Sequence, residues 1–130
     1  MEGQGAARND ALCYGNRAHE TLETDAEGVM VVEAHGRLDS TTSKAFGDRL
    51  TSLLETGHGA LVVDLKSIAY MSSVGFQALL KANRAAAGVG CKLALCGVTG
   101  EVGRLFDLGG FADEFLIFRT QADGIGKLRP

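Results

Sequence analysis

The stretch that decides the fold is LVVDLKSIAYMSSVGF, residues 61–76. Its first part, 61–65, is nearly all apolar, which is typical of a strand that is central in a sheet or covered on both faces. A short connection follows, and two adjacent hydroxyl residues, Ser72 and Ser73, then stand where an apolar helical pattern begins. The segment therefore predicts a strand, a connection and a helix, which is the repeating unit of an α/β domain.

The helix after this connection is predicted over about 73–87, and the glycines at 88 and 90 should end it. Apolar residues spaced at about 100° per residue should form one broad arc that packs on the sheet. This arc comprises Val74, Phe76, Ala78, Leu79, Ala82, Ala85 and Ala86. The opposite, polar side carries Ser73, Gln77, Lys81 and Arg84.

Upstream of this unit, the pattern predicts a hairpin and a helix. Residues 19–24 and a β-branched run over 29–34 should form two strands joined by a turn at 25–28. Ser40 and Thr41 can cap the helix that follows. Its apolar residues at helical spacing are Phe46, Leu50, Leu53 and Leu54, and Gly57 can close it.

Downstream, residues 92–96 and 115–118 are predicted strands, and Thr99 and Thr120 can each begin a short helix. The order is β-β-α-β-α-β-α-β-α, which predicts an α/β fold with a mixed, mostly parallel β-sheet packed with α-helices. A length of 130 residues fits one domain. We expect that domain over 19–130, after a flexible N-terminal extension over 1–18.

Composition excludes several classes of function. The net charge of −3, the absence of Trp and an aromatic content of 6% argue against nucleic-acid binding. No apolar run approaches the roughly 18 residues that a membrane span needs, so no membrane insertion is expected. The first 17 residues lack the apolar middle of a signal peptide, and the expected location is cytoplasmic.

The sequence offers no catalytic or metal-binding constellation. His19, His35 and His58 share neither metal-ligand nor triad spacing. The cysteines, Cys13, Cys91 and Cys96, form no CxxC pair, and we expect reduced thiols, with the last two on opposite faces of the sheet. No catalytic residue, metal or cofactor is therefore predicted.

One glycine-rich turn leaves an alternative open. The segment GVTGEVG, residues 97–103, follows a strand and opens a helix, as a phosphate-binding turn would. It matches neither GxGxxG nor the GK[ST] ending of a P-loop. A tight turn with a helix cap explains it better, and a small-ligand or nucleotide-binding module remains an alternative function.

Ser72 and Ser73 lie where a helix N-terminus should leave its N–H groups unpaired. The helix dipole is positive there. Ser72 can act as the N-cap, with Ser73 in the first turn of the helix. Ser73 also heads the polar side, where another protein can reach it. Capping explains one serine, and regulatory phosphorylation is an alternative explanation for the other.

Three segments resemble a known family. MSSVG at 71–75, preceded by VVDL at 62–65, resembles the phosphorylation-site motif of STAS domains, and more narrowly of bacterial anti-sigma factor antagonists. HGRLD at 35–39 resembles the loop after the second strand of that family. VGRLFDLGG at 102–110 resembles its third-helix segment. The similarity runs in consistent order over about 28–128.

The resemblance implies a phosphorylation-controlled binding module and not an enzyme. It implies that Ser73, before Val74 and Gly75, is the phosphorylated residue; many family members have Asp at the position of Ser72, and others have Ser. The implied partners are an anti-sigma factor that is also a serine-protein kinase and a serine phosphatase that reverses the modification. A constitutive scaffold subunit of a lipid-transport or stress-signalling complex is the alternative within the family. The expected partner-binding residues are Asp39, Ser40, Ser72, Ser73, Gly75, Gln77 and Lys81.

Overall fold

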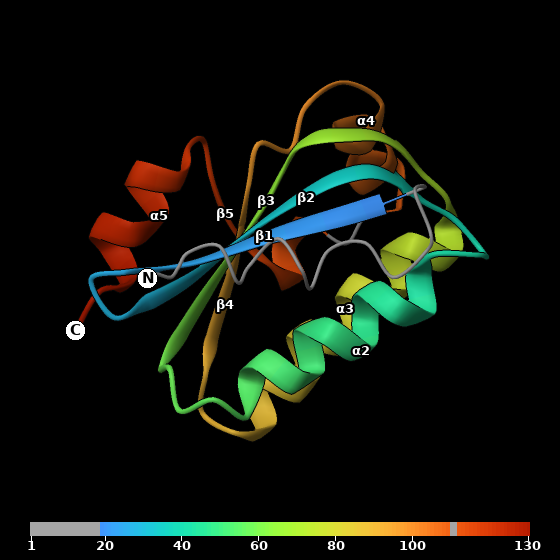
Figure 1. Cartoon of the computed structure of the whole chain (residues 1–130). Coiled ribbons are helices and arrows are strands. Elements are labelled where there is room, and N and C mark those ends of the chain that lie inside the picture. The colour runs from blue at the N-terminus through green and yellow to red at the C-terminus, as the bar shows by residue number, and fades with distance from the viewer. Residues whose placement is uncertain (1–18, 110–111) are drawn as a thin grey trace.

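The computed structural model describes residues 19–109 and 112–130, and these form one α/β domain around a five-stranded sheet (Figure 1). The strands lie in the order β1-β2-β3-β4-β5. The order of elements along the chain is the predicted one, with a short 3₁₀ helix, η1, added before the last strand. The elements are β1 (His19–Ala26), β2 (Val29–Leu38), α2 (Ser43–Leu54), β3 (Ala60–Met71), α3 (Ser73–Gly88), β4 (Lys92–Cys96), α4 (Gly100–Gly109), η1 (Ala112–Glu114), β5 (Leu116–Phe118) and α5 (Gln121–Leu128).

The first two strands form the predicted hairpin. They pair antiparallel, with Ala26 opposite Val29. The two loop residues between them, Glu27 and Gly28, have φ values of 57° and 88°. Positive φ at both positions matches the twist of the flanking strands and favours glycine at the second. The carboxylate of Asp25 accepts the N–H of Gly28 at 3.0 Å and closes the predicted turn.

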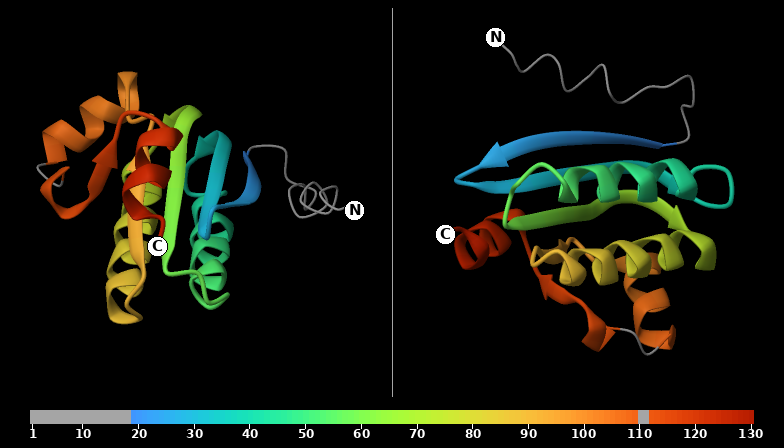
Figure 2. Two further views of the ribbon diagram at one scale, coloured as in Figure 1. Left: turned by 90° about the vertical axis from the view of Figure 1, so that its left-hand side faces the viewer. Right: turned by 90° about the horizontal axis from the view of Figure 1, so that it is seen from below.

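The other strands pair in parallel, and their connecting helices divide between the two faces of the sheet. The larger core cluster contains buried residues of α2, α3 and α4, together with Val32, Val63 and Leu95 from the sheet. The smaller cluster lies on the opposite face, where α5 packs, and contains Val62 and Cys96 (Figure 2). Alternate residues of each central strand therefore enter opposite cores, which explains why 61–65 is apolar apart from Asp64.

Several element boundaries differ from prediction, and β2, predicted over 29–34, runs to Leu38. β3 continues to Met71 because its backbone keeps pairing with β2 up to Leu38, although Lys66 and Ser67 are exposed and interrupt the apolar pattern. The helix predicted to be capped by Ser40 and Thr41 begins instead at Ser43, and Thr42 is its N-cap residue without a side-chain cap. The cause is the carboxylate of Asp39, which accepts the Thr41 N–H and so holds Thr41 in the loop.

The predicted apolar arc of α3 is wrong at its first residue. Val74 is 46% exposed, whereas Phe76, Leu79, Ala82 and Ala86 are buried as expected. Val74 lines a groove between α3 and α2, so the neighbouring helix and not the sheet sets its surroundings.

The cysteine prediction is confirmed for the two residues that can be placed. Cys91 and Cys96 are free and buried, and they belong to the core clusters on opposite faces of the sheet. Cys13 and the expected extension over 1–18 lie outside the described residues. Within the described chain, no helix combines the length and the apolar character needed to cross a membrane.

Candidate functional site

The turn between β3 and α3 gives its two serines different roles. The Ser72 hydroxyl accepts the N–H of Gly75 at 3.2 Å, and the Ser72 N–H donates to the Leu38 carbonyl at 2.9 Å. Ser72 is half-buried and is the predicted N-cap. Ser73 is the first residue of α3 and is exposed to solvent. Only Ser73 therefore presents its side chain freely at the start of the helix.

Gly75 allows this turn to pack closely against the end of β2. It is buried, and a Cβ at this position would lie 2.7 Å from the carbonyl oxygen of Leu38 and 2.9 Å from its Cβ. No side chain fits at that distance without a shift of backbone. Gly75 thus belongs to the site through its backbone, which allows the turn to approach the strand beneath it.

The loop after β2 is held by Asp39. One carboxylate oxygen pairs with Arg37 at 2.8 Å, and the other accepts the N–H and the hydroxyl of Thr41 at 3.0 and 2.7 Å. The Thr41 hydroxyl is the main cause that lowers the pKa of Asp39, with further lowering from the Thr41 N–H and Arg37. Asp39 is therefore a fixed carboxylate at neutral pH, and it leaves Ser40 exposed beside it.

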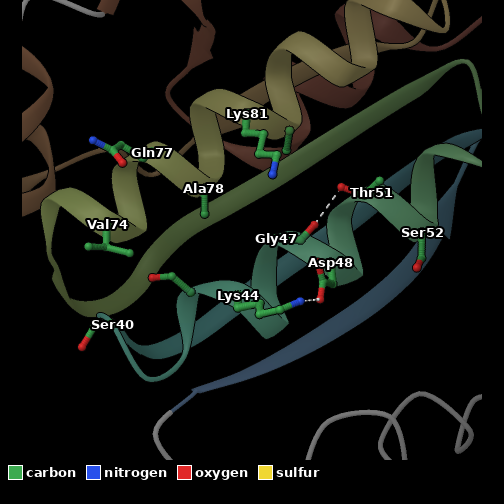
Figure 3. Close-up of a pocket in the computed structure, with 12 residues that line it drawn as sticks. Ser40, Lys44, Gly47, Asp48, Thr51, Ser52, Val74, Gln77, Ala78 and Lys81 are labelled. Carbon is green, nitrogen blue, oxygen red and sulfur yellow. Dashed lines mark hydrogen bonds and ion pairs between the residues drawn. The ribbon is translucent and has the colours of Figure 1, made fainter.

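A groove of about 710 Å³ runs between α2 and α3 (Figure 3). Small residues let the helices approach, since a Cβ at Gly47 would lie 3.5 Å from that of Ala78. On the α2 wall, Lys44 and Asp48 form an exposed ion pair at 2.8 Å. The lining residues are Ser40, Ser43, Lys44, Gly47, Asp48, Thr51, Ser52, Val74, Gln77, Ala78, Lys81 and Ala82.

The structure brings several predicted partner-binding residues to this groove. Ser40, Gln77 and Lys81 line it, and Ser73 precedes the lining residue Val74. The groove itself was missed by sequence reasoning, because two separately predicted helices reveal no contact between them. Gly47 was the available signal, since a glycine inside a helical pattern often marks a close approach.

The glycine-rich segment after β4 belongs to a different place. Gly97 has a φ of +69°, and a Cβ there would lie 2.7 Å from the Asp64 carboxylate. This close approach favours the predicted tight turn. Asp64 is buried and accepts bonds from the Lys66 N–H at 2.9 Å and the Gln121 amide at 2.8 Å. Among the described residues, no group of three or more His, Cys, Asp or Glu could hold a metal ion.

With the fold and this site in place, comparison with known proteins defines the family. The STAS domain model matches residues 23–124, which is most of the chain, and the protein belongs to the STAS domain family. The family resemblance of the three sequence segments is thereby confirmed.

Similar solved structures include several anti-sigma factor antagonists. One from Mycobacterium paratuberculosis is 26% identical, with a TM-score of 0.73 over 86% of this chain and 95% of that one. SpoIIAA in its unphosphorylated form is 18% identical, with a TM-score of 0.71 over 86% and 96%. The Bacillus cell fate determinant SpoIIAA in its phosphorylated form is 17% identical, with a TM-score of 0.65 over 86% and 100%. The two SpoIIAA structures show that the fold is shared.

Proposed function

We propose that this protein is an anti-sigma factor antagonist that switches partners through phosphorylation of Ser73. In its unphosphorylated form it binds an anti-sigma factor that is also a serine-protein kinase. Phosphorylation releases it, and a serine phosphatase restores it. The observation that carries this proposal is the exposed Ser73 hydroxyl at the start of α3, beside an open groove between two helices. The 26%-identical antagonist and the existence of SpoIIAA in both phosphorylation states support it.

The geometry favours Ser73 over Ser72 as the phosphorylated residue. The Ser72 oxygen already accepts the Gly75 N–H, and Ser72 is half-buried. Phosphorylation of Ser72 would disturb this cap and place a charged group in a partly buried turn. Ser73 can take a phosphate without a change in the turn, and the N-terminal end of a helix favours an anion.

The switch would act through charge at an interface. Phosphate adds about −1.5 to −2 charges and three acceptor oxygens. At Ser73 this charge would stand at the end of the groove that Ser40 and Val74 line. A loss of about 3 kcal/mol in binding free energy corresponds to roughly two decades in the dissociation constant. The module itself then needs no catalytic group, and its expected place of action is the cytoplasm.

The proposed partner surface combines the Asp39–Ser40 loop, the Ser72–Ser73 turn and the polar side of α3. Asp39 would contribute a fixed carboxylate, and Gln77 and Lys81 would offer hydrogen-bond donors from the groove. Gly75 would act through its backbone, by holding the turn against β2.

Affinity capture followed by mass spectrometry tests the proposal. The wild type and Ser73→Ala should capture a kinase from the source cell, whereas Ser73→Asp should not. Added ATP should release the wild type and leave Ser73→Ala bound, with phosphate mapped to Ser73. Phosphate on Ser72 alone would contradict the assignment. Equal capture by all three proteins would instead identify a constitutive scaffold subunit.

A further inference from the structure

His58 connects two segments that are distant in sequence. It lies in the connection between α2 and β3, and its side chain is 20% exposed. Its ring nitrogen Nδ1 lies 2.8 Å from the hydroxyl oxygen of Thr56 in the same connection. Its other ring nitrogen, Nε2, lies 3.1 Å from a carboxylate oxygen of Asp25, near the end of β1. Both ring nitrogens are therefore at hydrogen-bond distance from a partner.

The hydroxyl of Thr56 has already donated its one proton. Its oxygen lies 2.7 Å from the carbonyl oxygen of Leu53, and a carbonyl can only accept. Toward His58 the hydroxyl must therefore accept, so Nδ1 carries a hydrogen. Hydroxyl, imidazole and carboxylate follow one another as in a catalytic triad, but the hydroxyl proton points away from the ring and no nucleophile is activated.

The partner of Nε2 is also an acceptor. The hydrogen bond with His58 is the main cause that lowers the pKa of Asp25, and the N–H of Gly28 lowers it further. Asp25 is therefore a carboxylate at neutral pH, and a carboxylate accepts hydrogen bonds only. Nε2 must then carry a hydrogen as well. Both bonds of His58 form together only when its ring is an imidazolium, with a hydrogen on each nitrogen.

We propose that Asp25, Thr56 and His58 form a pH-sensitive clasp between the β1–β2 hairpin and the connection after α2, and that the clasp is complete only when the His58 ring is protonated. A neutral ring donates from one nitrogen, so it loses its bond to Thr56 or to Asp25. Histidine is the side chain whose ordinary titration falls between about pH 5 and 8. A second contact between β1 and α2, from Arg49 to Glu23 at 2.6 Å, contains no histidine. The change is therefore confined to the hairpin end of β1.

The other charged groups near the clasp are exposed, and among the described residues the ring forms hydrogen bonds and ion pairs with the clasp residues alone. Two of these groups are acidic and two are basic, and salt screens exposed charges. They are Glu27 in the hairpin turn, Glu55 just after α2, Lys92 at the start of β4 and Arg129, which pairs with Glu27 at 2.6 Å. The carboxylate of Asp25 is therefore the charge that decides the protonation of His58.

The clasp lies apart from the proposed switch site. None of its three residues lines the groove. It holds the connection that follows α2, whereas the loop of Asp39 and Ser40 precedes that helix. The inference is thus independent of the proposed function.

Thermal unfolding of the full chain at about pH 6 and pH 8, on either side of the ordinary range of histidine, tests the clasp. The folded protein keeps a proton that the unfolded chain releases as the pH rises, so the stability that the clasp contributes should fall with rising pH. His58→Gln should lower the melting temperature by about 2–4 °C at the lower pH and by less than about 1 °C at the higher one. The difference between the two proteins cancels the titration of all other groups.

Asp25→Asn is the matched variant for the direction of the effect. The asparagine oxygen can still accept the N–H of Gly28, while its amide nitrogen donates and therefore pairs with a neutral ring. In this background, His58→Gln should cost no more at the lower pH than at the higher one. The ¹⁵N signals of the ring should show that the form with two hydrogens persists to higher pH in the wild type than in Asp25→Asn. Circular dichroism confirms that each variant is folded. A loss for His58→Gln that is equal at both pH values, or equal persistence of the imidazolium in the two proteins, would overturn the proposal.

Discussion

At the scale of single residues, the contact between Gly75 and Leu38 connects the site to the core. The Leu38 carbonyl accepts the Ser72 N–H and faces the Cα of Gly75, where a side chain would collide with it. Leu38 is itself fully buried at the end of β2. The position of Ser73 thus depends on the close packing of a glycine two residues away.

Gly75→Ala should lower the free energy of unfolding by about 1–3 kcal/mol, the usual cost of overpacking against a backbone that cannot move away. Gly88→Ala is the matched control at the other end of α3, where a Cβ would meet nothing within 4 Å. That change should be neutral or stabilising, because alanine favours helix over glycine. Urea unfolding measures both. Equal stability of the two variants would show that the Gly75 contact is not needed.

At the scale of the element, the two adjacent serines at the start of α3 have different roles. Ser72 has extended backbone angles, φ −88° and ψ 174°, and caps the helix from outside. Ser73 already lies in the helix and is exposed. The same hydroxyl group therefore stabilises the helix as a cap at Ser72 and is accessible to solvent at Ser73.

Alanine substitutions should separate these roles. Ser72→Ala removes the acceptor of the Gly75 N–H and should lower the free energy of unfolding by about 0.5–2 kcal/mol. Ser73→Ala, which matches it in chemistry and differs by one position, should change it by no more than about 0.5 kcal/mol. Thermal or urea unfolding distinguishes the two. If Ser73→Ala lowered the free energy of unfolding more than Ser72→Ala, the assignment of the cap to Ser72 would be contradicted.

The elements also show what sequence could and could not predict. The strand at 92–96, the hairpin turn and the Ser72 cap follow from local patterns and are present. The length of β3 depends on pairing with β2, which continues after the apolar pattern ends. The exposure of Val74 depends on where α2 packs, and the groove exists only between the two helices. Local signals therefore predicted the elements, and long-range packing decided the site.

At the scale of the whole molecule, the proposed switch site lies on only one of the two faces of the sheet. α2 and α3 lie on one face and form the groove, and α5 covers part of the other face (Figure 1). The first turn of α5 is capped by the Thr120 hydroxyl as that of α3 is capped by Ser72, although it already carries Asp123. This second capped turn, on the other face of the sheet, provides a control for the position of an added charge.

Ser73→Asp should keep the fold and weaken binding of the partner kinase by at least about tenfold, or 1.4 kcal/mol. An acidic residue in the first turn of a helix is favourable by about 0.3–1 kcal/mol, and Ser73 is exposed, so the added charge stays in solvent. Ala122→Asp adds the same charge to the exposed first turn of α5 and should leave binding unchanged. Circular dichroism melts and calorimetric titration of the captured partner measure both properties. A Ser73→Asp protein that unfolds, or that binds as tightly as Ala122→Asp, would show that charge at this turn does not operate an interface switch.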